Sequence, residues 1–378
     1  MQRRTFLGVA AAGALAGPTQ APAPAQSPAP AQAPDPTRPP LRLAMAGLVH
    51  GHASGFLGRY RGSKEVALVG VAEPDAMVAN RYARQYKLDP ATVHPNLDAL
   101  LDAAKPEAVV AFTSTADHLA VVAACARRKI PVMMEKPLAV DVAQARAIER
   151  AAAESGIPVL VNYETTWYPS NHAAYALAHE AKALGPIRKV VVHDGHRGPK
   201  EIGCQPEFVA WLTDPARNGA GALFDFGCYG ANLMTWLMDD ARPTRVTAVT
   251  QQLKPDVYPH VDDEATILLE YPGAQAILQA SWNWPFDRKD MEIYGRAGQV
   301  ATLAQDRIRV RLPGQAEETR PAAPLPAPAD DFLRYFAAVV RGEIKPTGLS
   351  SLANNLIVVE ILDAARRSAA TGQSVRLG

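Results

Sequence analysis

A regular alternation of short apolar runs and helical stretches between residues 41 and 162 constrains the fold most strongly. The apolar runs are rich in Val, Leu, Ile and Ala, and they lie at 41–46, 66–72, 108–112, 130–134 and 158–162. Helical patterns accompany them at 53–60, 75–86, 96–104, 118–128 and 141–155. Strands that alternate with helices predict a parallel sheet with right-handed crossovers. We therefore expect an α/β protein whose residues 41–162 form a Rossmann dinucleotide-binding domain.

The turn after the first strand has the layout of a dinucleotide-binding loop. A glycine turn between a strand and a helix presents backbone N–H groups to a pyrophosphate. Gly47 takes the first position of the three-glycine pattern, whereas Val49 and His52 occupy the second and third. The match is partial, and on it we predict cofactor contacts from Gly47, Val49, His50 and His52.

The second strand ends at Glu73, about 20 residues beyond the turn, where an acid can bind the adenosine ribose hydroxyls. A carboxylate at this position would repel a 2′-phosphate, so NAD is favoured over NADP. The alternative is an acid that only starts the next helix, just before Pro74.

Polar residues follow the later strands, at the edge where the carboxyl ends of parallel strands face the ligand crevice. The predicted cofactor contacts from these strand ends are Thr113, Ser114, His118, Glu135, Lys136 and Asn162. Capping of the following helix would explain the hydroxyl groups equally well. Lys136 lies between Glu135 and Pro137 and could hold a cofactor or a reacting oxygen. The alternative explanation for Lys136 and Glu135 is a solvated charge pair at a turn.

The second half of the chain has a different pattern. A helix is expected at 171–183, and strands at 187–194, 245–252, 264–271, 274–282 and 291–295. The turn Tyr271-Pro272-Gly273-Ala274 joins two of these strands, which favours antiparallel pairing. We predict an α+β domain at 163–325 with a largely antiparallel open sheet, which supplies a substrate wall and a partner surface. Two helices within 326–378 should pack back on the body and have a structural role.

A glycine-rich run from Asn218 leads to Asp225 and Tyr229, which stand four residues apart. In a helix that starts near Asp225 these two side chains share one face. A tyrosine beside a lysine is a usable acid or base, because the cation lowers the phenol pKa. The alternative for Tyr229 is a buried aromatic residue whose hydroxyl is hydrogen-bonded.

The Glu135-Lys136-Pro137 motif, the segment leading to Asp225 and Tyr229, and the nucleotide fold together resemble the Gfo/Idh/MocA family of sugar oxidoreductases. The resemblance covers about residues 41–378 and implies that Lys136 contacts both substrate and nicotinamide. Many members carry an acid followed four residues later by a histidine. Tyr229 at that place looks more like glucose-fructose oxidoreductase and the dimeric dihydrodiol dehydrogenases, which implies a tyrosine proton carrier. Relatives also imply a homo-oligomer paired through the C-terminal sheet.

Further polar and aromatic residues are candidates for binding a sugar, because sugars offer apolar faces to indoles and hydroxyls to polar groups. The predicted substrate contacts are Tyr163, His193, His196, Trp282 and Trp284. Core packing is the alternative for the two tryptophans. The residue between the histidines, Asp194, points to the other face of a strand, so no metal site is predicted.

These residues predict an enzyme that oxidises a pyranose sugar or glycoside with a tightly bound NAD, using Lys136 and Tyr229 as acid–base pair with Asp225. A second reading is a redox-neutral NAD-dependent glycosidase that works by transient oxidation and elimination. A third is a non-catalytic sugar-binding protein. The net charge of +1 gives no electrostatic footprint for nucleic acid.

The amino end reads as an export signal. Arg3 and Arg4 precede an apolar small-residue run, which predicts a twin-arginine signal peptide at 1–17. Residues 18–40 are almost all Pro, Ala and Gln and should form a disordered tether. We expect a periplasmic or extracellular protein without stable membrane insertion after signal cleavage. Three cysteines are an odd number, so no disulfide framework is expected.

Overall fold

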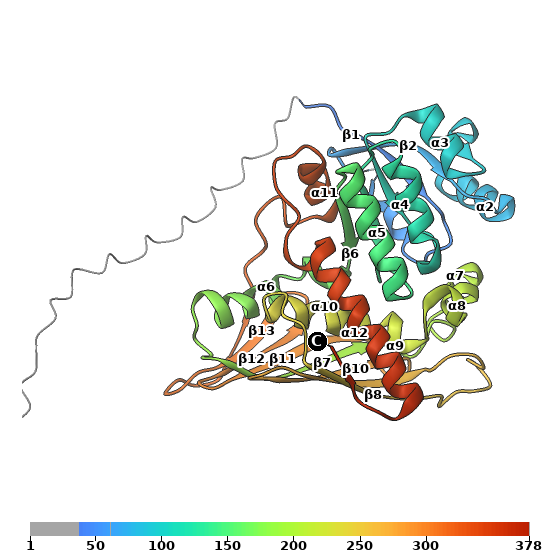
Figure 1. Cartoon of the computed structure of the whole chain (residues 1–378). Helices are drawn as coiled ribbons and strands as arrows, with labels where there is room; N and C mark the ends of the chain where they lie inside the picture. Colours follow the sequence, from blue (N-terminus) through green and yellow to red (C-terminus); the bar gives the residue numbers. More distant parts are fainter. Residues whose placement is uncertain (1–37, 61, 378) are drawn as a thin grey trace, which may run out of the picture. The chain divides into compact units, whose positions relative to one another are not determined.

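Two β-sheets organise the part of the chain that the computed structural model describes, residues 38–60 and 62–377 (Figure 1). All of these residues belong to one compact structural unit, Asp35–Gly378. The predicted signal peptide, and the tether up to residue 37, lie outside the described residues.

The first sheet has six parallel strands in the order β3-β2-β1-β4-β5-β6. This is the order of a Rossmann sheet, in which the ligand crevice opens where β1 and β4 lie side by side. The predicted fold of this half is therefore confirmed. Its strands are β1 Leu41–Ala46, β2 Val66–Ala72, β3 Val93–His94, β4 Ala108–Ala111, β5 Val132–Glu135 and β6 Val159–Asn162.

Side-chain caps fix where the helices of this half begin. Asp75 accepts from the backbone N–H groups of Met77 and Val78, so α2 starts one residue later than the predicted 75–86. Asn96 and Asp141 cap the following helices in the same way. The helices are α1 Ala53–Tyr60, α2 Ala76–Tyr86, α3 Leu97–Ala104, α4 His118–Ala126 and α5 Val142–Ser155.

The second sheet has nine strands in the order β14-β13-β12-β11-β7-β10-β9-β8-β15. All its pairings are antiparallel except that of β7 with β10, so the predicted largely antiparallel sheet is confirmed. The prediction missed β12 to β15. Its strands are β7 Ile187–Gly195, β8 Arg245–Gln251, β9 Glu264–Glu270, β10 Gln275–Ser281, β11 Arg288–Gly295, β12 Gln299–Ala304, β13 Arg307–Arg311, β14 Glu318–Pro321 and β15 Val375–Arg376.

Helices cover one face of the second sheet only (Figure 1). Along β9, Ala265, Ile267 and Leu269 are buried against this helical layer while the residues between them are half-buried. No helix of the described chain lies on the other face. Val249, which alternates with the buried Val246 and Ala248 of β8, points to that face and is 63% exposed. The covering helices are α6 Pro169–Tyr175, α9 Ala222–Asp225, α10 Gly227–Leu237 and α12 Leu352–Thr371.

The two tail helices pack differently. Helix α11, Phe332–Val340, places Leu333 and Phe336 in the same hydrophobic core as the β1 strand. Helix α12 contacts β8 and α10 on one side and α5 on the other. The tail therefore packs on both sheets.

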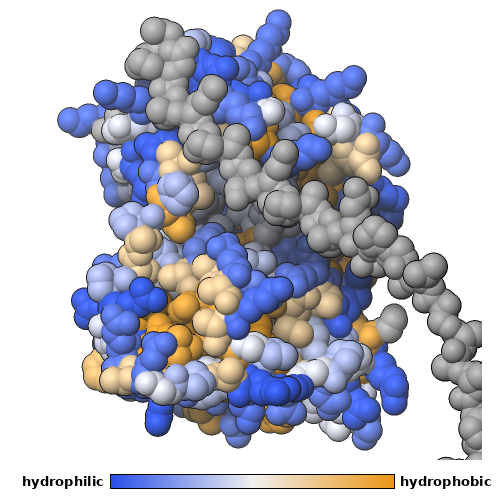
Figure 2. All heavy atoms as spheres, turned by 90° about the vertical axis from the view of Figure 1, so that its left-hand side faces the viewer, coloured by the Kyte–Doolittle hydropathy of each residue, from blue (hydrophilic) through white to orange (hydrophobic). Residues whose placement is uncertain are grey.

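Hydrophilic residues predominate on the face drawn in Figure 2, and hydrophobic residues gather there in smaller patches. Among the helices of residues 38–377 none is both long enough and apolar enough to cross a bilayer.

Candidate active site

A buried ion pair lies at the end of β5. The Lys136 ammonium donates to Asp225 Oδ1 at 2.5 Å and to the Asp225 carbonyl at 2.8 Å. The second carboxylate oxygen accepts from Trp282 Nε1 at 2.9 Å. Lys136 is 6% exposed and Asp225 4%. The motif lysine is thus fixed by a carboxylate from the other half of the chain, and the solvated-pair alternative for Lys136 is wrong.

Each partner keeps the other charged. Burial opposes the charged form of Lys136, but the Asp225 carboxylate outweighs it and raises the lysine pKa. Burial also opposes ionisation of Asp225, and Lys136 outweighs it and lowers the pKa of the acid. The pair is therefore an ammonium and a carboxylate at neutral pH.

Asp225 and Tyr229 do not share one helix, contrary to the prediction. Helix α9 ends at Asp225 and α10 begins at Gly227, with Phe226 between them. The start of α9 is held by Asp262, whose carboxylate accepts from the N–H groups of Gly221 and Leu223 at 2.9 and 2.7 Å. The break turns the Asp225 carbonyl toward Lys136 instead of into a helix.

Tyr229 faces Lys136 with its ring rather than its hydroxyl. The Lys136 Nζ lies 4.9 Å from the ring centroid, and the Lys289 Nζ lies 5.2 Å from it. The hydroxyl has no hydrogen-bond partner among the described residues. Burial raises the Tyr229 pKa well above its usual value, so the predicted lowering by Lys136 is wrong.

The backbone of the glycine turn is largely engaged within the protein. The N–H of Leu48 donates to Glu73 Oε2 at 2.7 Å, that of His50 to the Phe112 carbonyl at 3.0 Å, and that of His52 to His50 Nδ1 at 3.1 Å. Gly47, at φ +79°, makes the tight turn itself. These N–H groups are consequently not free for a phosphate.

A helix that the sequence reading did not anticipate covers this turn. Helix α7, Pro206–Leu212, brings Trp211 Nε1 to 3.1 Å from the Val49 carbonyl. A Cβ added at Gly51 would lie 3.3 Å from the Phe208 ring, and Glu207 pairs with Arg81 of α2. A pyrophosphate at the start of α1 would need this space. In this conformation the turn therefore does not fit a dinucleotide.

Glu73 is likewise committed to the protein. Its second oxygen accepts from the N–H of Asp75 at 3.0 Å, and the residue is 3% exposed. Burial raises its pKa. The carboxylate is buried and held by two backbone N–H groups, so the predicted contact with a ribose would require the surrounding residues to move.

The residues after β4 are also bound to protein groups. Ser114 donates to Asp117 at 2.5 Å, and Thr113 donates to the Ser114 carbonyl at 3.1 Å. The ring of His118 makes its hydrogen bond through Nδ1 to the Leu138 carbonyl at 3.1 Å. These three predicted cofactor contacts stabilise the crevice edge, and Ser114 caps no helix with its side chain.

Glu135 and its partners form a second polar centre at the same edge. Its carboxylate lies 2.9 Å from His52 Nδ1 and accepts from Asn162 Nδ2 at 3.1 Å. Asn162 in turn accepts from Trp167 Nε1 at 2.9 Å. Burial opposes ionisation of Glu135, but His52 outweighs it and lowers the pKa to about 2. The site thus brings the predicted residues His52, Glu135 and Asn162 together.

A cavity of about 440 Å³ opens beside this network. His52, Glu135, Asn162 and Trp167 line it, together with Glu164. Its volume is within the usual range for small-molecule sites.

The predicted sugar contacts do not form one group. Trp282 and Tyr163 are fully buried, so neither offers a face to a ligand, and the core alternative holds for Trp282. His193 pairs with Asp290 at 3.0 Å, and its ring lies 5.9 Å from Trp284. Alternate residues of β7 point to opposite faces, so His193 lies on the other side of the sheet from Asp194.

His196 lies closer to the ion pair. Its ring is 4.8 Å from that of Phe226, the residue that follows Asp225. Its Nδ1 accepts from the N–H of Gly198 at 2.9 Å. Of the predicted substrate residues, His196 and the buried Trp282 lie beside the Lys136–Asp225 pair.

Three charged residues near the site were missed from the sequence. Lys289 pairs with Glu164 and lies opposite Asp194 in the β7–β11 ladder. Asp194 is 2% exposed, its Oδ1 has no partner in the described chain, and burial raises its pKa well above normal. The alternation of β7 could have indicated that Asp194 faces inward, whereas Lys289 required the strand register.

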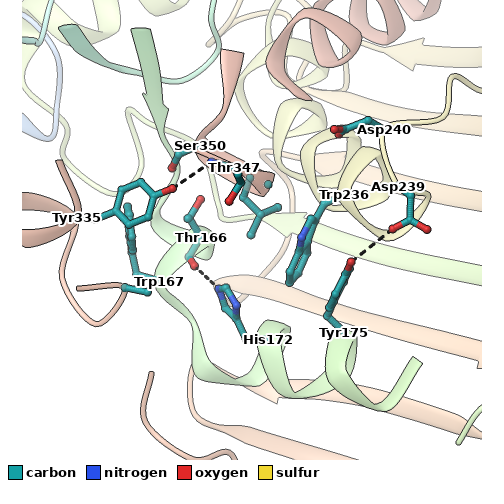
Figure 3. Close-up of a pocket in the computed structure, with 13 residues that line it drawn as sticks. Thr166, Trp167, His172, Tyr175, Trp236, Asp239, Asp240, Tyr335, Thr347 and Ser350 are labelled. Atoms are coloured by element: carbon teal, nitrogen blue, oxygen red, sulfur yellow. Dashed lines mark hydrogen bonds between the residues drawn. The ribbon is translucent and has the colours of Figure 1, made fainter. Parts of the chain in front are cut away.

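A separate cavity of about 510 Å³ lies between α6, α10 and the tail (Figure 3). Trp236 and Tyr175 are stacked there with ring centroids 4.1 Å apart, and Trp167 packs edge-on against Tyr335. None of the predicted site residues lines this cavity.

The sheet order and the Lys136 edge define a Rossmann-fold enzyme, and comparison with known proteins agrees. Residues 41–163 match the profile of the oxidoreductase family with an NAD-binding Rossmann fold. Residues 174–301 match the GFO/IDH/MocA C-terminal domain.

Named relatives cover most of the chain. Trans-1,2-dihydrobenzene-1,2-diol dehydrogenase of Sus scrofa is 24% identical over 321 residues, covering 80% of this chain and 89% of the relative. Inositol 2-dehydrogenase of Rhizobium meliloti is 25% identical, covering 84% and 93%. An inositol dehydrogenase homolog from Azotobacter vinelandii, solved with NAD+, has a TM-score of 0.78 at 21% identity, covering 90% and 98%.

The chain belongs to the Gfo/Idh/MocA family of oxidoreductases, as its sequence motifs indicated.

Proposed function

We propose that this protein is an oxidoreductase acting on a hydroxyl group of a sugar or polyol that is held beside Lys136. The observation that carries the proposal is the hydrogen bonding of the buried ammonium. Lysine has three N–H donors, and the two described bonds of Lys136 both go to Asp225. The remaining donor is available to an oxygen of the substrate.

Each residue of the ion pair has a distinct task in this proposal. Lys136 donates to the reacting oxygen and stabilises the negative charge that develops when its proton leaves. Asp225 keeps the ammonium charged and fixes its direction. Tyr229, whose pKa is raised, keeps its proton at neutral pH and can act as a hydrogen-bond donor but not as the base.

The cofactor that the family implies is a nicotinamide dinucleotide, which accepts hydride when bound. We infer NAD rather than NADP, because the carboxylate of Glu73, just after β2, would repel the 2′-phosphate of NADP. Binding of the pyrophosphate requires α7 to leave Val49 and Gly51.

A redox-neutral glycosidase is the second candidate. The observation in its favour is the position of α7 over the turn. A dehydrogenase that releases NADH at every turnover needs an open groove. An enzyme that returns the hydride to its substrate does not.

The test is a panel of sugars, polyols and nitrophenyl glycosides, assayed with purified protein for NADH formation and for glycoside cleavage. Turnover of any substrate of the wild-type protein should be lost in Lys136→Met, because methionine keeps the bulk of the lysine side chain but not its charge. Lys345→Met, at an exposed lysine, should behave like wild type. Full activity of Lys136→Met would refute the proposal, and sugar binding without turnover would favour a non-catalytic sugar-binding protein.

We also propose export by the twin-arginine route, which the Arg3-Arg4 leader supports. A reporter fused to residues 1–40 should be transported. Replacing both Arg3 and Arg4 by lysine in this fusion should abolish its transport. Transport that persists in that variant would contradict it.

We propose in addition that two copies pair through the uncovered face of the second sheet. The exposed Val249 on this face supports the proposal, because apolar residues on a sheet face favour burial. Native mass spectrometry should show a dimer or larger assembly in wild type and more monomer in Val249→Asp. A monomeric wild type would refute the proposal.

A further inference from the structure

We propose that His52, oriented by Glu135, is a catalytic residue that takes a proton from a hydroxyl group bound in the 440 Å³ cavity. The inference rests on the proposed function, since this hydroxyl belongs to the same sugar or polyol. It gives one residue of the glycine turn a task in proton transfer.

The geometry is that of a histidine fixed by a carboxylate. Helix α1 begins at Ala53, so His52 is held at its start, with Nδ1 2.9 Å from Glu135 Oε2. Glu135 is 3% exposed and cannot turn away, because Asn162 donates to its other oxygen. Trp167 fixes Asn162 in turn. The His52 side chain, by contrast, is 46% exposed and lines the cavity.

This arrangement determines the chemistry of the ring. An ionised Glu135 accepts the Nδ1–H of His52, which leaves the lone pair of Nε2 available to a molecule in the cavity. When a hydroxyl donates to Nε2, its O–H bond breaks, the electron pair stays on oxygen and an N–H bond forms. The imidazolium that results lies against the Glu135 carboxylate, which stabilises it.

The cavity is suited to a hydroxylated ligand. Trp167 and Tyr168 supply aromatic surface, and Glu164 supplies a half-exposed carboxylate that can accept hydrogen bonds from hydroxyl groups. Arg59 and Asp331 lie further along the same wall. A sugar or polyol can thus meet both apolar and acidic groups beside His52.

The rest of the turn holds His52 in place. His50 is 2% exposed, and its Nδ1 accepts from the His52 N–H, which fixes the backbone of the proposed base. The rings of Phe208 and Trp211 pack on His50 at 5.1 and 5.6 Å. His50 is therefore a positioning residue.

A metal ion would be an alternative use of the same groups. Donor atoms of His50, His52 and Glu135 lie within 4.8 Å of one another. However, the bond that His50 Nδ1 accepts from a backbone N–H places the proton of the neutral ring on Nε2. Neither nitrogen of His50 then has a free lone pair, which favours proton transfer over metal binding.

The first experiment needs no substrate. The full-length protein is treated with diethyl pyrocarbonate, which acylates imidazole nitrogens with a free lone pair, and the rate at each histidine is measured by peptide mass spectrometry. We expect His52 to react in wild type and to react several-fold more slowly in Glu135→Gln. The exposed His260 should react at the same rate in both proteins. A His52 rate that Glu135→Gln does not change would overturn the proposal.

The second experiment uses the substrate found in the panel above. His52→Asn should lower kcat by about 10²–10⁴-fold with little change in KM, and His260→Asn should not. Added imidazole should restore part of the activity of His52→Ala, but not that of Lys136→Met. Loss in Lys136→Met with full activity in His52→Asn would refute this inference and leave the proposed function intact. Absence of turnover on every sugar would refute the proposed function, and the acylation rates would still decide the role of His52.

Discussion

Replacing Asp225 with Asn should destabilise the protein strongly, because the change leaves a buried ammonium without its carboxylate. Lys136 is 6% exposed, and its hydrogen bonds in the described structure both go to Asp225. Removing one partner of a buried ion pair costs about 3–5 kcal/mol. The Asp225→Asn variant would keep the backbone carbonyl as an acceptor, so we expect a loss of about 3 kcal/mol at neutral pH.

The pH dependence of this loss has a defined sign. The folded-state pKa of Lys136 is raised, so its contribution is complete below the unfolded pKa of about 10.4 and is lost above the folded value. The pKa of Asp225 is lowered, so its contribution is complete above about 3.9 and is lost as the pH falls through the folded value. Without the carboxylate, burial lowers the lysine pKa instead. The variant should therefore recover stability relative to wild type as the pH rises toward about 10.

Urea unfolding followed by circular dichroism, at neutral pH and at about pH 9.5, measures both effects. The matched control is the double variant Lys136→Met, Asp225→Leu, which removes both charges and should be less destabilised than the single variant. If Asp225→Asn unfolds at the wild-type urea midpoint at both pH values, the pair does not stabilise the fold as argued.

Three further changes test other parts of the structure. Trp211→Ala should open the glycine turn and increase NAD affinity in isothermal titration calorimetry, whereas unchanged affinity would mean that α7 is not what closes it. Gly47→Ala, at φ +79° with Cβ 2.7 Å from Thr113, should cost about 1–3 kcal/mol in urea unfolding, and a neutral effect would contradict the observed turn. Burial raises the pKa of the Cys125 and Cys228 thiols to about 12. Both thiols should therefore resist Ellman's reagent in the native protein near pH 8 and react after unfolding in guanidinium. Rapid reaction of the native protein at these two residues would refute their burial.

Local signals made much of the first sheet predictable. Strands Leu41–Ala46 and Val66–Ala72 and helix Ala53–Tyr60 have the predicted bounds. Each combines a clear hydrophobic period with glycine, proline or polar residues at its ends. The alternation of strands and helices also predicted the parallel sheet, because such strands pair through right-handed crossovers.

The second sheet was less predictable. Strand β13 alternates Arg and apolar residues, Arg307–Arg311, and could have been found from that pattern. The pairing of β7 with β10 could not be found, because it joins residues 86 positions apart through backbone bonds that have no sequence signature.

The site divides in the same way. The sequence indicated Lys136, Asp225 and Glu135, which lie at strand and helix ends. Their partners depend on long-range packing, as in the contact of His52 with Glu135 across 83 positions. The raised pKa of Tyr229 follows from burial, which neighbouring residues in the sequence do not reveal.

Helix α12 has a mechanical consequence for how ligands reach the site. Its Glu360 accepts from Arg146 of α5 and from Arg242 near β8, and its Arg366 donates to the carbonyls of Val140 and Gly219. This helix therefore acts as a strut that ties the Rossmann sheet to the nine-stranded sheet and opposes a hinge motion between them. Entry to the crevice must then depend on displacement of a short segment such as α7. The hydrogen bond from the Trp211 indole of this helix to the Val49 carbonyl can break without movement of either sheet.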